Sequence, residues 1–231
     1  MGAMGSMGSM EGPRAVVTVC WSPKGGSGTT VIAASLALTL AARHGSALLV
    51  DLAGDVPAVL GMAEPSGQGA LDWLASPDAG PDALARLAYP GAGGLDVVAA
   101  GTGPPHGPWP PGRAAALVDA LAGEQRPVIV DAGLLHPGLH DLVARATSSL
   151  LVIRSCYLAL RRAVAAPVRP SGIVLVHEPG RALSRADVAE VLGVPVVATV
   201  PLSPDVARAV DAGLLASRLP SGLSRNLRTA A

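Results

Sequence analysis

A glycine-rich segment near the start of the chain carries the residue types that bind phosphate groups. It reads Ser22-Pro23-Lys24-Gly25-Gly26-Ser27-Gly28-Thr29-Thr30, and Lys24 is the only lysine, because the other 16 basic residues are arginine. An ammonium is a compact point charge that suits a tight loop better than a planar guanidinium does. Successive backbone amides that lead into a helix N-terminus attract anions. The expected phosphate contacts are Lys24, Gly25, Gly26, Ser27, Gly28, Thr29 and Thr30.

This loop departs from the usual P-loop pattern G-x-x-x-x-G-K-[ST], in which the lysine directly follows the last glycine. Here Thr29 occupies that lysine position, and Pro23 occupies the first glycine position. Thr30 keeps the hydroxyl position that ligates Mg²⁺ in such loops. A plain strand–helix turn is the alternative, but it does not account for the whole succession of Lys-Gly-Gly, Gly and Thr-Thr before a helix.

Two aspartates lie at the ends of apolar runs that we expect to be strands. Asp51 follows the run that starts at Ala47, and Asp131 closes Val128–Asp131. Open parallel sheets bind ligands at the carboxyl ends of their strands. Each aspartate alone is a weak signal, since strand-ending aspartates also cap turns, but the two aspartates and the glycine-rich loop reinforce one another as three segments at consecutive sheet ends. The expected metal ligands are Thr30, Asp51 and Asp131, and the expected catalytic residues are Lys24, Asp51 and Asp131.

Short β-branched runs alternate with Ala/Leu-rich stretches along the chain, which predicts strands alternating with helices. The expected strands are Ala15–Cys20, Ala47–Leu52, Leu95–Ala100, Val128–Asp131, Leu150–Arg154, Ile173–His177 and Pro195–Val200. The expected helices are Thr30–Arg43, Leu71–Ala75, Asp82–Ala88, Arg113–Ala122, Leu139–Ala146, Leu158–Ala166, Ser184–Leu192 and Pro204–Ala212. Uninterrupted apolar strands belong to sheets that are covered on both faces. We therefore expect an α/β fold with a doubly wound, mostly parallel sheet.

Residues 1–13 are expected to be a tag or disordered tail, and residues 14–231 a single domain, with the Pro/Gly-rich segment 101–112 as its most mobile insertion. Half of the residues are hydrophobic and only 2% are aromatic, so the core is expected to consist of Ala, Val and Leu. Two cysteines provide no disulfide framework, which favours a reducing, cytoplasmic location. The longest apolar stretch is too short to span a bilayer.

The net charge of zero is unevenly distributed along the chain. Residues 1–151 contain 7 basic and 12 acidic side chains, whereas residues 152–231 contain 10 basic and 5 acidic ones. The excess of arginines in residues 152–231 can mean only that they lie on solvated helix faces. Alternatively, they form a binding patch for an acidic partner, lipid headgroups or nucleic acid. Without dense clusters or interleaved aromatics, the signal for nucleic-acid binding is weak. Residues 214–227 contain Pro220 and Gly222 and make a poor membrane-binding helix, so weak membrane association is the most that we expect.

The pattern resembles the ParA/MinD group of deviant-Walker ATPases over nearly all of residues 14–219. The loop of that group reads K-G-G-x-G-K-[ST], and its first lysine matches Lys24. Segments 22–30, 51–55 and 192–196 look most like the TadZ/CpaE-like and actinobacterial septum-site-determining branch. The resemblance implies a P-loop NTPase fold, ATP or ADP with Mg²⁺, and a homodimer in which Lys24 reaches the partner's nucleotide. It also implies protein partners in a Flp/Tad-type pilus, secretion or division apparatus, with recruitment to a membrane site or pole.

Three departures from the active members of the group concern turnover and base recognition. Thr29 replaces the P-loop lysine, and Ala53 replaces the aspartate that orients the attacking water. Asp55 lies two residues further along the turn, and we expect its side chain to point away from that water. Losing one charge-stabilising contact costs about 10²–10³ in rate, so hydrolysis is expected to be weak or absent. His177 matches the base-contacting asparagine, while Pro201 and Leu202 can still read adenine through backbone atoms. The leading expectation is a nucleotide-holding spatial organiser.

Two other readings stay open, namely a nucleotide-free interaction scaffold and a ligase-type or reductase-like enzyme of the same superfamily. A metal site at His136, His140 and Asp141 is disfavoured, because Pro137-Gly138 keeps the two histidines off one helix face. Trp109 is expected to be a loop anchor or a partner contact.

Overall fold

The computed structural model describes residues 15–63 and 65–230, so the segment expected to be a tag lies outside the described residues. Its centre is an eight-stranded sheet in the order β3-β4-β2-β5-β1-β6-β7-β8. The strands are β1 (Val17–Ser22), β2 (Ala47–Asp51), β3 (Tyr89–Pro90), β4 (Leu95–Val98), β5 (Val128–Leu134), β6 (Ser148–Arg154), β7 (Gly172–His177) and β8 (Val196–Pro201). Neighbouring strands are parallel except at the β3–β4 edge, which is antiparallel. The predicted mostly parallel sheet is confirmed.

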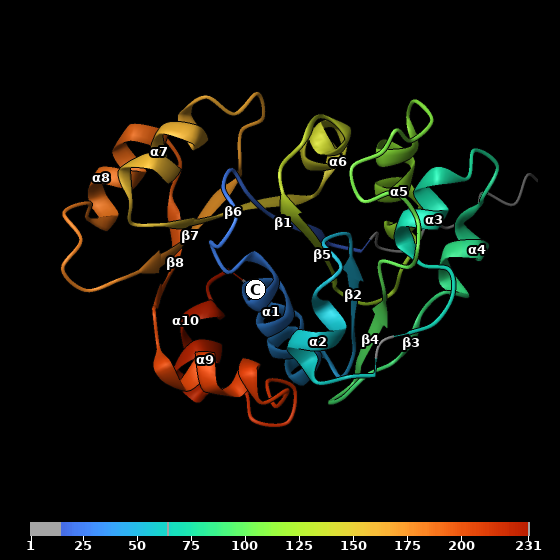
Figure 1. Ribbon diagram of the computed structural model, residues 1–231, viewed down its shortest axis with the longest axis horizontal. Coiled ribbons are helices and arrows are strands. Elements are labelled where there is room, and N and C mark those ends of the chain that lie inside the picture. Colours follow the sequence, from blue (N-terminus) through green and yellow to red (C-terminus); the bar gives the residue numbers. More distant parts are fainter. Residues whose placement is uncertain (1–14, 64, 231) are drawn as a thin grey trace, which may run out of the picture.

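Helices cover both faces of this sheet (Figure 1). One layer contains α1 (Thr29–His44), α2 (Val56–Leu60), α9 (Pro204–Asp211) and α10 (Ser221–Leu227). The other contains α3 (Ala70–Ala75), α4 (Pro81–Ala85), α5 (Arg113–Leu121), α6 (His140–Arg145), α7 (Tyr157–Val164) and α8 (Arg185–Leu192), with a 3₁₀ turn at Pro137–Leu139 before α6. Successive residues of a strand point to opposite faces, so Val19 and Trp21 join one hydrophobic cluster and Cys20 joins the other.

Helix α1 is the platform on which the glycine-rich loop rests. It contacts β1, β2 and β5 on one side and α2 and α10 on the other, which explains why it is buried almost all round and rich in alanine. Small side chains let the helix approach the sheet closely. The helix ends at Gly45, whose φ of 86° is the left-handed conformation that glycine adopts at helix C-termini. Its N-terminus is therefore fixed at the carboxyl edge of the sheet.

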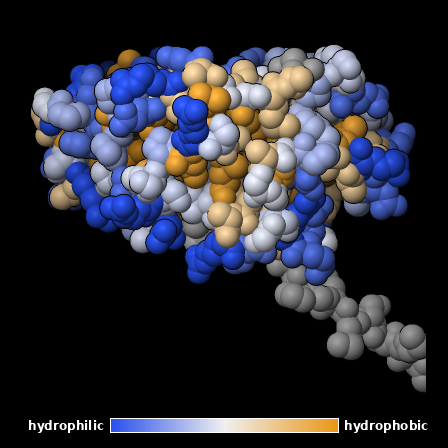
Figure 2. Space-filling view, turned by 90° about the horizontal axis from the view of Figure 1, so that it is seen from below, coloured by the Kyte–Doolittle hydropathy of each residue, from blue (hydrophilic) through white to orange (hydrophobic). Residues whose placement is uncertain are grey.

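The C-terminal segment contains a helix that was not among the expected ones. Residues 221–227 form α10, and Leu223 and Leu227 are buried in the same cluster as α1, so this segment completes the core. Helix α9 has no buried residue of its own, but Val206 and Val210 pack on that cluster. Figure 2 views this side from below and shows hydrophobic residues gathered centrally with hydrophilic ones around them.

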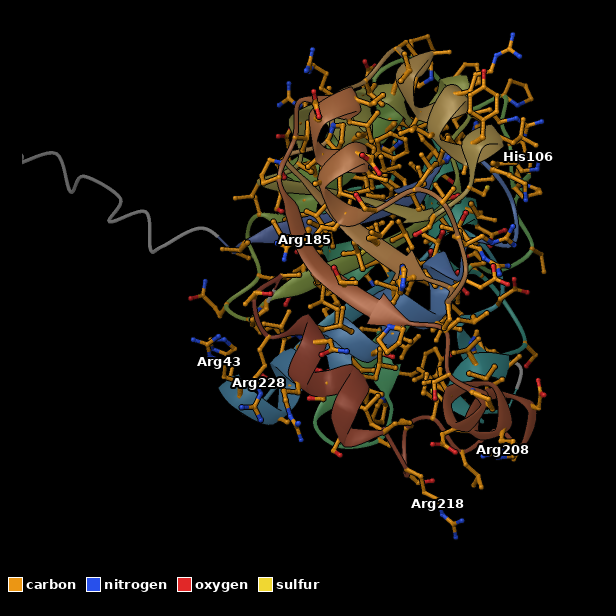
Figure 3. All side chains as sticks on the ribbon, turned by 90° about the vertical axis from the view of Figure 1, so that its left-hand side faces the viewer. Arg43, His106, Arg185, Arg208, Arg218 and Arg228 are labelled. Atoms are coloured by element: carbon orange, nitrogen blue, oxygen red, sulfur yellow. The ribbon has the colours of Figure 1, made fainter. Side chains whose placement is uncertain are left out.

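The cationic residues of the last third do not form one patch. Figure 3 shows Arg185 and Arg228 apart from Arg208 and Arg218, which line one hollow together with Asp205 and Asp211. Arg154 and Arg181 both pair with Glu178, at 2.8 and 2.7 Å. The weak signal for nucleic-acid binding is consistent with this scatter. Within residues 15–63 and 65–230, no helix combines the length and the apolar character needed to cross a bilayer.

Candidate functional site

The glycine-rich loop joins β1 to α1 with its backbone facing open space. Gly26 and Gly28 have φ of 75° and 84°, which non-glycine residues rarely adopt. No atom lies within 4 Å of the place where a Cβ would stand at Gly25, Gly26 or Gly28. Gly28 is the N-cap of α1, and the first turn has neither a side-chain cap nor an acidic residue. The first amides of α1 are therefore left for an anion.

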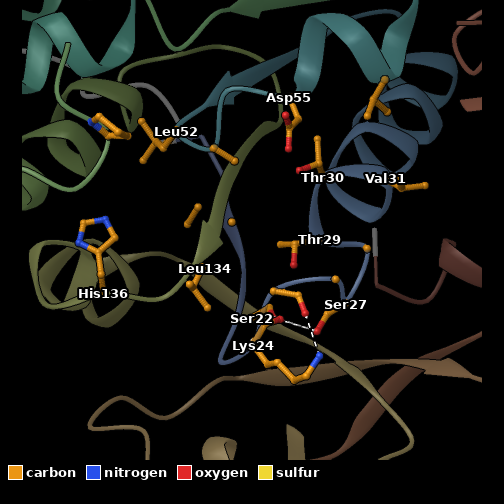
Figure 4. A pocket seen from close by; sticks show the side chains of 18 of the residues that line it. Ser22, Lys24, Ser27, Thr29, Thr30, Val31, Leu52, Asp55, Leu134 and His136 are labelled. Carbon is orange, nitrogen blue, oxygen red and sulfur yellow. Dashed lines mark hydrogen bonds between the residues drawn. The ribbon is translucent and has the colours of Figure 1, made fainter. Parts of the chain in front are cut away.

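Two buried serines hold the loop in this shape. The Ser27 hydroxyl donates to the Lys24 carbonyl at 2.8 Å, and the Lys24 amide donates to Ser22 Oγ at 3.1 Å. The two hydroxyls are 3.0 Å apart (Figure 4). Lys24 is half-buried, and its Nζ donates to the carbonyl of Gly25 at 3.1 Å. Ser27 thus acts first on loop geometry, while Lys24 sits at the outer tip of the loop.

A cavity of about 710 Å³ lies in front of the loop. Its other walls come from residues after β2, residues at the end of β5, and the tip of the 101–112 segment. Residues of these walls include Ala53, Asp55, Gly133, His136, Pro105 and His106. The volume suits a ligand of nucleotide size. The predicted loop residues 24–30 all line this cavity.

Asp51 lies behind the cavity wall, fully buried. Its Oδ1 accepts hydrogen bonds from the amides of Ala53 and Gly54 at 2.9 and 2.7 Å, and its Oδ2 accepts one from Val56 at 3.1 Å. Burial raises the pKa of Asp51, and these three amides act against the rise. Both oxygens therefore already hold the turn that leads into α2.

Asp131 is also fully buried, directly beside Asp51 in the β2–β5 register. Its Oδ1 accepts from the Gly133 amide at 3.1 Å, while Oδ2 has no hydrogen-bond partner among the described residues. Burial raises the pKa of Asp131 to about 7, with Asp51 and Asp55 adding to the rise and the Thr30 hydroxyl and Gly133 amide opposing it. Strand β5 continues three residues past Asp131, to Leu134, instead of ending there as expected.

The unsatisfied carboxylate oxygen of Asp131 close to the Thr30 hydroxyl fits a magnesium ion, since Mg²⁺ prefers oxygen ligands and keeps several waters. No group of three or more His, Cys, Asp or Glu side chains in the described ranges is arranged to hold a metal. This donor set therefore suits a cation that is shared with phosphate oxygens and water better than one enclosed by protein alone. His136, His140 and Asp141 are likewise not arranged to hold a metal in the described structure.

Asp55 is where the sequence-based expectation was wrong. Because Asp51 caps the turn, α2 begins at Val56 and Asp55 becomes its N-cap residue, with no side-chain cap bond. The Asp55 carboxylate lies on the cavity wall beside Thr30 (Figure 4). The Asp55 carboxylate thus faces the cavity, although the neighbouring Ala53, at the position where a carboxylate is missing, has none.

A second, mostly apolar hollow of about 220 Å³ lies on the other side of the loop. Gly26, Ser27 and Gly28 line both spaces, and Pro201 and Leu202 line the hollow. His177 is not part of its lining. The His177 carbonyl accepts the Leu202 amide at 2.7 Å, so this residue holds the segment that lines the hollow. The size and apolar lining of the hollow suit a flat apolar group such as a purine, beside the glycine-rich loop.

Two histidines of the cavity wall meet although they are distant in sequence. The rings of His106 and His136 stand edge to face with centroids 5.1 Å apart, and the ring centroid of Trp109 is 5.4 Å from that of His136. Sequence reasoning considered His136 only with His140 and did not single out His106. The contact joins two loops and follows no local spacing, so the sequence carries no signal for it.

The family model of the CobQ/CobB/MinD/ParA nucleotide binding domain matches residues 18–216. Among solved structures, the ParA family ATPase of Chlorobium tepidum TLS is 20% identical, with a TM-score of 0.71 over 93% of this chain and 96% of that one. The septum site-determining protein MinD of Pyrococcus horikoshii OT3, complexed with Mg-ADP, is 18% identical, with a TM-score of 0.71 over 93% of each chain. MinD in the MinC:MinD cell division complex of Aquifex aeolicus is 18% identical, with a TM-score of 0.65 over 92% and 96%.

No curated protein sequence matches the chain significantly. The structural likenesses agree with the observed sheet order and helix layers, and the family model covers both the glycine-rich loop and Asp131. The chain belongs to the CobQ/CobB/MinD/ParA nucleotide binding domain family.

Proposed function

We propose that this protein binds ATP or ADP with Mg²⁺ and acts as a dimer-forming spatial organiser with weak or absent hydrolysis. One observation carries the proposal. The uncapped N-terminus of α1 and the buried Asp131, with its unpartnered Oδ2, meet near Thr30 at one cavity. An anion site and a cation ligand side by side suit a phosphate chain with its counterion. Family membership and the Mg-ADP complex of the P. horikoshii relative support this reading.

Each part of the site would have a separate task. Amides of the loop and of the first turn of α1 would hold the phosphates, and Thr30 and Asp131 would hold Mg²⁺, which neutralises phosphate charge when bound. Asp51 keeps the turn before α2 in place. The purine would occupy the apolar hollow beside Pro201 and Leu202. His177 would act on this hollow indirectly, through its bond to the Leu202 amide.

Slow turnover follows from the groups that face the cavity. Thr29 offers a hydroxyl where the related loops place an ammonium, and Ala53 offers no carboxylate. Asp55 is the one carboxylate among the lining residues, so any remaining hydrolysis would depend on it. A protein that hydrolyses its nucleotide slowly stays in the nucleotide-bound state for a long time, and such a lasting state can mark a position in the cell. The proposed setting is a Flp/Tad-type pilus, a secretion machine or the division site, with recruitment to a membrane site or pole.

A nucleotide-free scaffold of the same fold is the second candidate. It is favoured by the state of two of the predicted site residues. Both oxygens of Asp51 are bonded to backbone amides, and Lys24 Nζ is bonded to the loop itself. The Asp51 oxygens thus need no ligand to be hydrogen-bonded, and the Lys24 ammonium already has one partner within its own loop.

Calorimetric titration with ATP and ADP, with and without Mg²⁺, separates the two candidates. We expect binding that Mg²⁺ strengthens, and Asp131→Asn should remove the Mg²⁺-dependent part. Asp119→Asn is the matched control, because Asp119 is an exposed partner of Arg145 far from the cavity. Absence of binding at millimolar ATP with Mg²⁺ would favour the nucleotide-free scaffold.

A further inference from the structure

We propose that His106 and His136 form an anion-recognising wall opposite the glycine-rich loop, which takes up protons when the phosphates of a nucleotide bind. The inference rests on the proposed nucleotide binding and adds to it a second recognition element, which is not part of the loop. It predicts a specific pH dependence of affinity.

The two imidazoles are held in place by their neighbours. Trp109 packs on His136, and its Nε1 donates to the carbonyl of Pro104 at 3.1 Å, which fixes the segment that carries His106. A Cβ added at Gly138 would stand 3.1 Å from the His136 ring and 3.2 Å from Trp109, so the packing there is tight. Figure 4 shows His136 across the cavity from Thr29 and Ser27. Figure 3 shows His106 at the edge of the molecule, far from Arg43.

The side chains that line the cavity carry little net positive charge, which the two histidines could supply. Its ionisable lining residues are Lys24, Asp55, His106 and His136. With neutral imidazoles, the charges of Lys24 and Asp55 cancel, and the usual loop lysine is absent because Thr29 stands there. A triphosphate nevertheless needs positive charge within a space of this kind. Histidine is the side chain that can supply it near neutral pH.

The surroundings of His136 disfavour its charged form. Burial lowers the pKa of His136, and the neighbouring His106 and His140 lower it further. The groups that face His136 are thus His106 from the 101–112 segment and His140 from α6, with Lys24 and Asp55 across the cavity. A bound phosphate would reverse the balance, because an opposite charge favours the charged imidazole. Binding would then take up protons at the histidines, so their contribution to affinity should rise as pH falls from 8 to 6.

The test compares the wild type with the double variant His106→Gln/His136→Gln at pH 6, 7 and 8, using a non-hydrolysable ATP analogue with Mg²⁺. Asp131 and the phosphates of the ligand also titrate in this range, but they are the same in both proteins. A histidine whose pKa rises by one unit on binding contributes about tenfold in affinity at low pH. We expect nearly equal affinities at pH 8 and a wild-type advantage of roughly tenfold or more at pH 6. His44→Gln, at the far end of α1, should follow the wild type.

Two further measurements make the outcome decisive. Nuclear magnetic resonance titration of the five histidines should show the pKa of His136 rising with ligand. Inorganic triphosphate should reproduce the pH effect and adenosine should not, because the wall recognises phosphate. Each variant is checked by its melting temperature, and single variants replace the double one if it unfolds.

Nucleotide binding with the same pH dependence in wild type and double variant would overturn the inference and leave the proposed function standing. Failure of every protein to bind nucleotide at any pH would overturn both. The two failures are distinguishable, because only the second lacks a binding signal altogether.

Discussion

Asp51 and Asp131 stand side by side on adjacent strands, yet their surroundings assign them different tasks. Three backbone amides satisfy Asp51, whereas Asp131 keeps one free oxygen in a fully buried position. Environments that separate two carboxyl groups in this way commonly separate their roles. Asp51 therefore holds the turn, and the ligand role that we propose falls to Asp131.

The stability of the ligand-free protein should report the burial of Asp131. Its pKa is raised to about 7 in the fold, above the ordinary value of 3.8, so its stabilising contribution is complete below pH 3.8 and is lost as pH rises toward 7. The carboxamide introduced by Asp131→Asn cannot ionise. We expect this variant to be more stable than wild type at pH 8 by on the order of 2 kcal/mol, and similar near pH 4.

Urea denaturation at pH 4, 5, 6, 7 and 8 measures this difference. The control Asp119→Asn removes an exposed carboxylate, and its difference from wild type should not widen with pH. A constant gap between Asp131→Asn and wild type across the series would contradict the assigned pKa.

Turnover should respond to Thr29 and Ala53 together and little to Thr29 alone. Thr29→Lys restores an ammonium beside the phosphates and should tighten ATP binding by about tenfold, as expected for one charged hydrogen bond. Its hydrolysis should stay within about tenfold of wild type, because Ala53 still cannot orient water. Adding Ala53→Asp should raise the rate further.

Phosphate release under single-turnover conditions is the measurement, with Asp131→Asn as the inactive reference. Asp55→Asn in the wild-type background should lower any residual rate, since Asp55 is the carboxylate on the cavity wall. Wild-type turnover of about 1 s⁻¹, typical of an active kinase, would refute the expectation of crippled hydrolysis.

At the scale of elements, strands and helices with long apolar runs could be predicted from the sequence. Short elements, and elements that form only through tertiary packing, could not. The strands around β1 and the helix α1 carry strong local signals, and so does the loop between them. Helix α2 has five residues and includes Pro57, and β3 has two residues including Pro90, so neither shows a readable period. Helix α10 contains glycine and follows Pro220, and its Leu223 and Leu227 are buried only because α1 and β8 lie next to it.

The residues of the candidate site likewise include some that the sequence predicts and some that it does not. The loop and Asp131 follow from sequence spacing, because adjacent strand ends of a parallel sheet bring them together. Asp55 on the cavity wall depends on the exact start of α2, which the sequence does not reveal. The pairing of His106 with His136 depends on how two loops pack.

Segment 101–112 should owe its position to Asp72 of α3. The Asp72 carboxylate accepts hydrogen bonds from the Gly69 amide at 2.8 Å, the Thr102 amide at 2.9 Å and the Thr102 hydroxyl at 3.1 Å. Partial burial acts to raise the pKa of Asp72, but these bonds lower it overall. Asp72→Ala should therefore destabilise the fold by about 1–3 kcal/mol and expose residues 103–112 to exchange.

Hydrogen exchange of backbone amides and urea denaturation check this prediction. Asp119→Ala, which loses only an exposed ion pair, should cost less than about 1 kcal/mol and leave the exchange of 103–112 unchanged. Unaltered exchange in Asp72→Ala would show that packing alone holds the segment.

At the scale of the whole molecule, the cavity is walled by its own chain on one side and open on the side of the loop tip. Lys24 is half-buried there, and Leu134 on the cavity rim is 47% exposed. Two copies that face each other would cover both features. The proposed dimer thus uses the same surface as the proposed nucleotide site.

ATP should raise the dimer fraction, and Lys24→Ala should remove that response while the fold stays intact. If Lys24 leaves the Gly25 carbonyl to reach the phosphates of the partner's nucleotide, then binding and association are linked, and each strengthens the other. Lys24→Arg should rescue only partly, because a planar guanidinium does not replace a compact ammonium in a glycine-lined space.

Analytical ultracentrifugation of these proteins, with and without a non-hydrolysable ATP analogue, measures the response. Arg218→Ala is the matched control, because it removes a solvent-exposed cation far from the loop (Figure 3) and should behave as wild type. Nucleotide binding by titration must be measured on the same samples, since a loss of binding would also suppress the dimer. If Lys24→Ala binds nucleotide and still dimerises like wild type, Lys24 is a solvated loop cation and the dimer must be closed by other residues of the cavity rim.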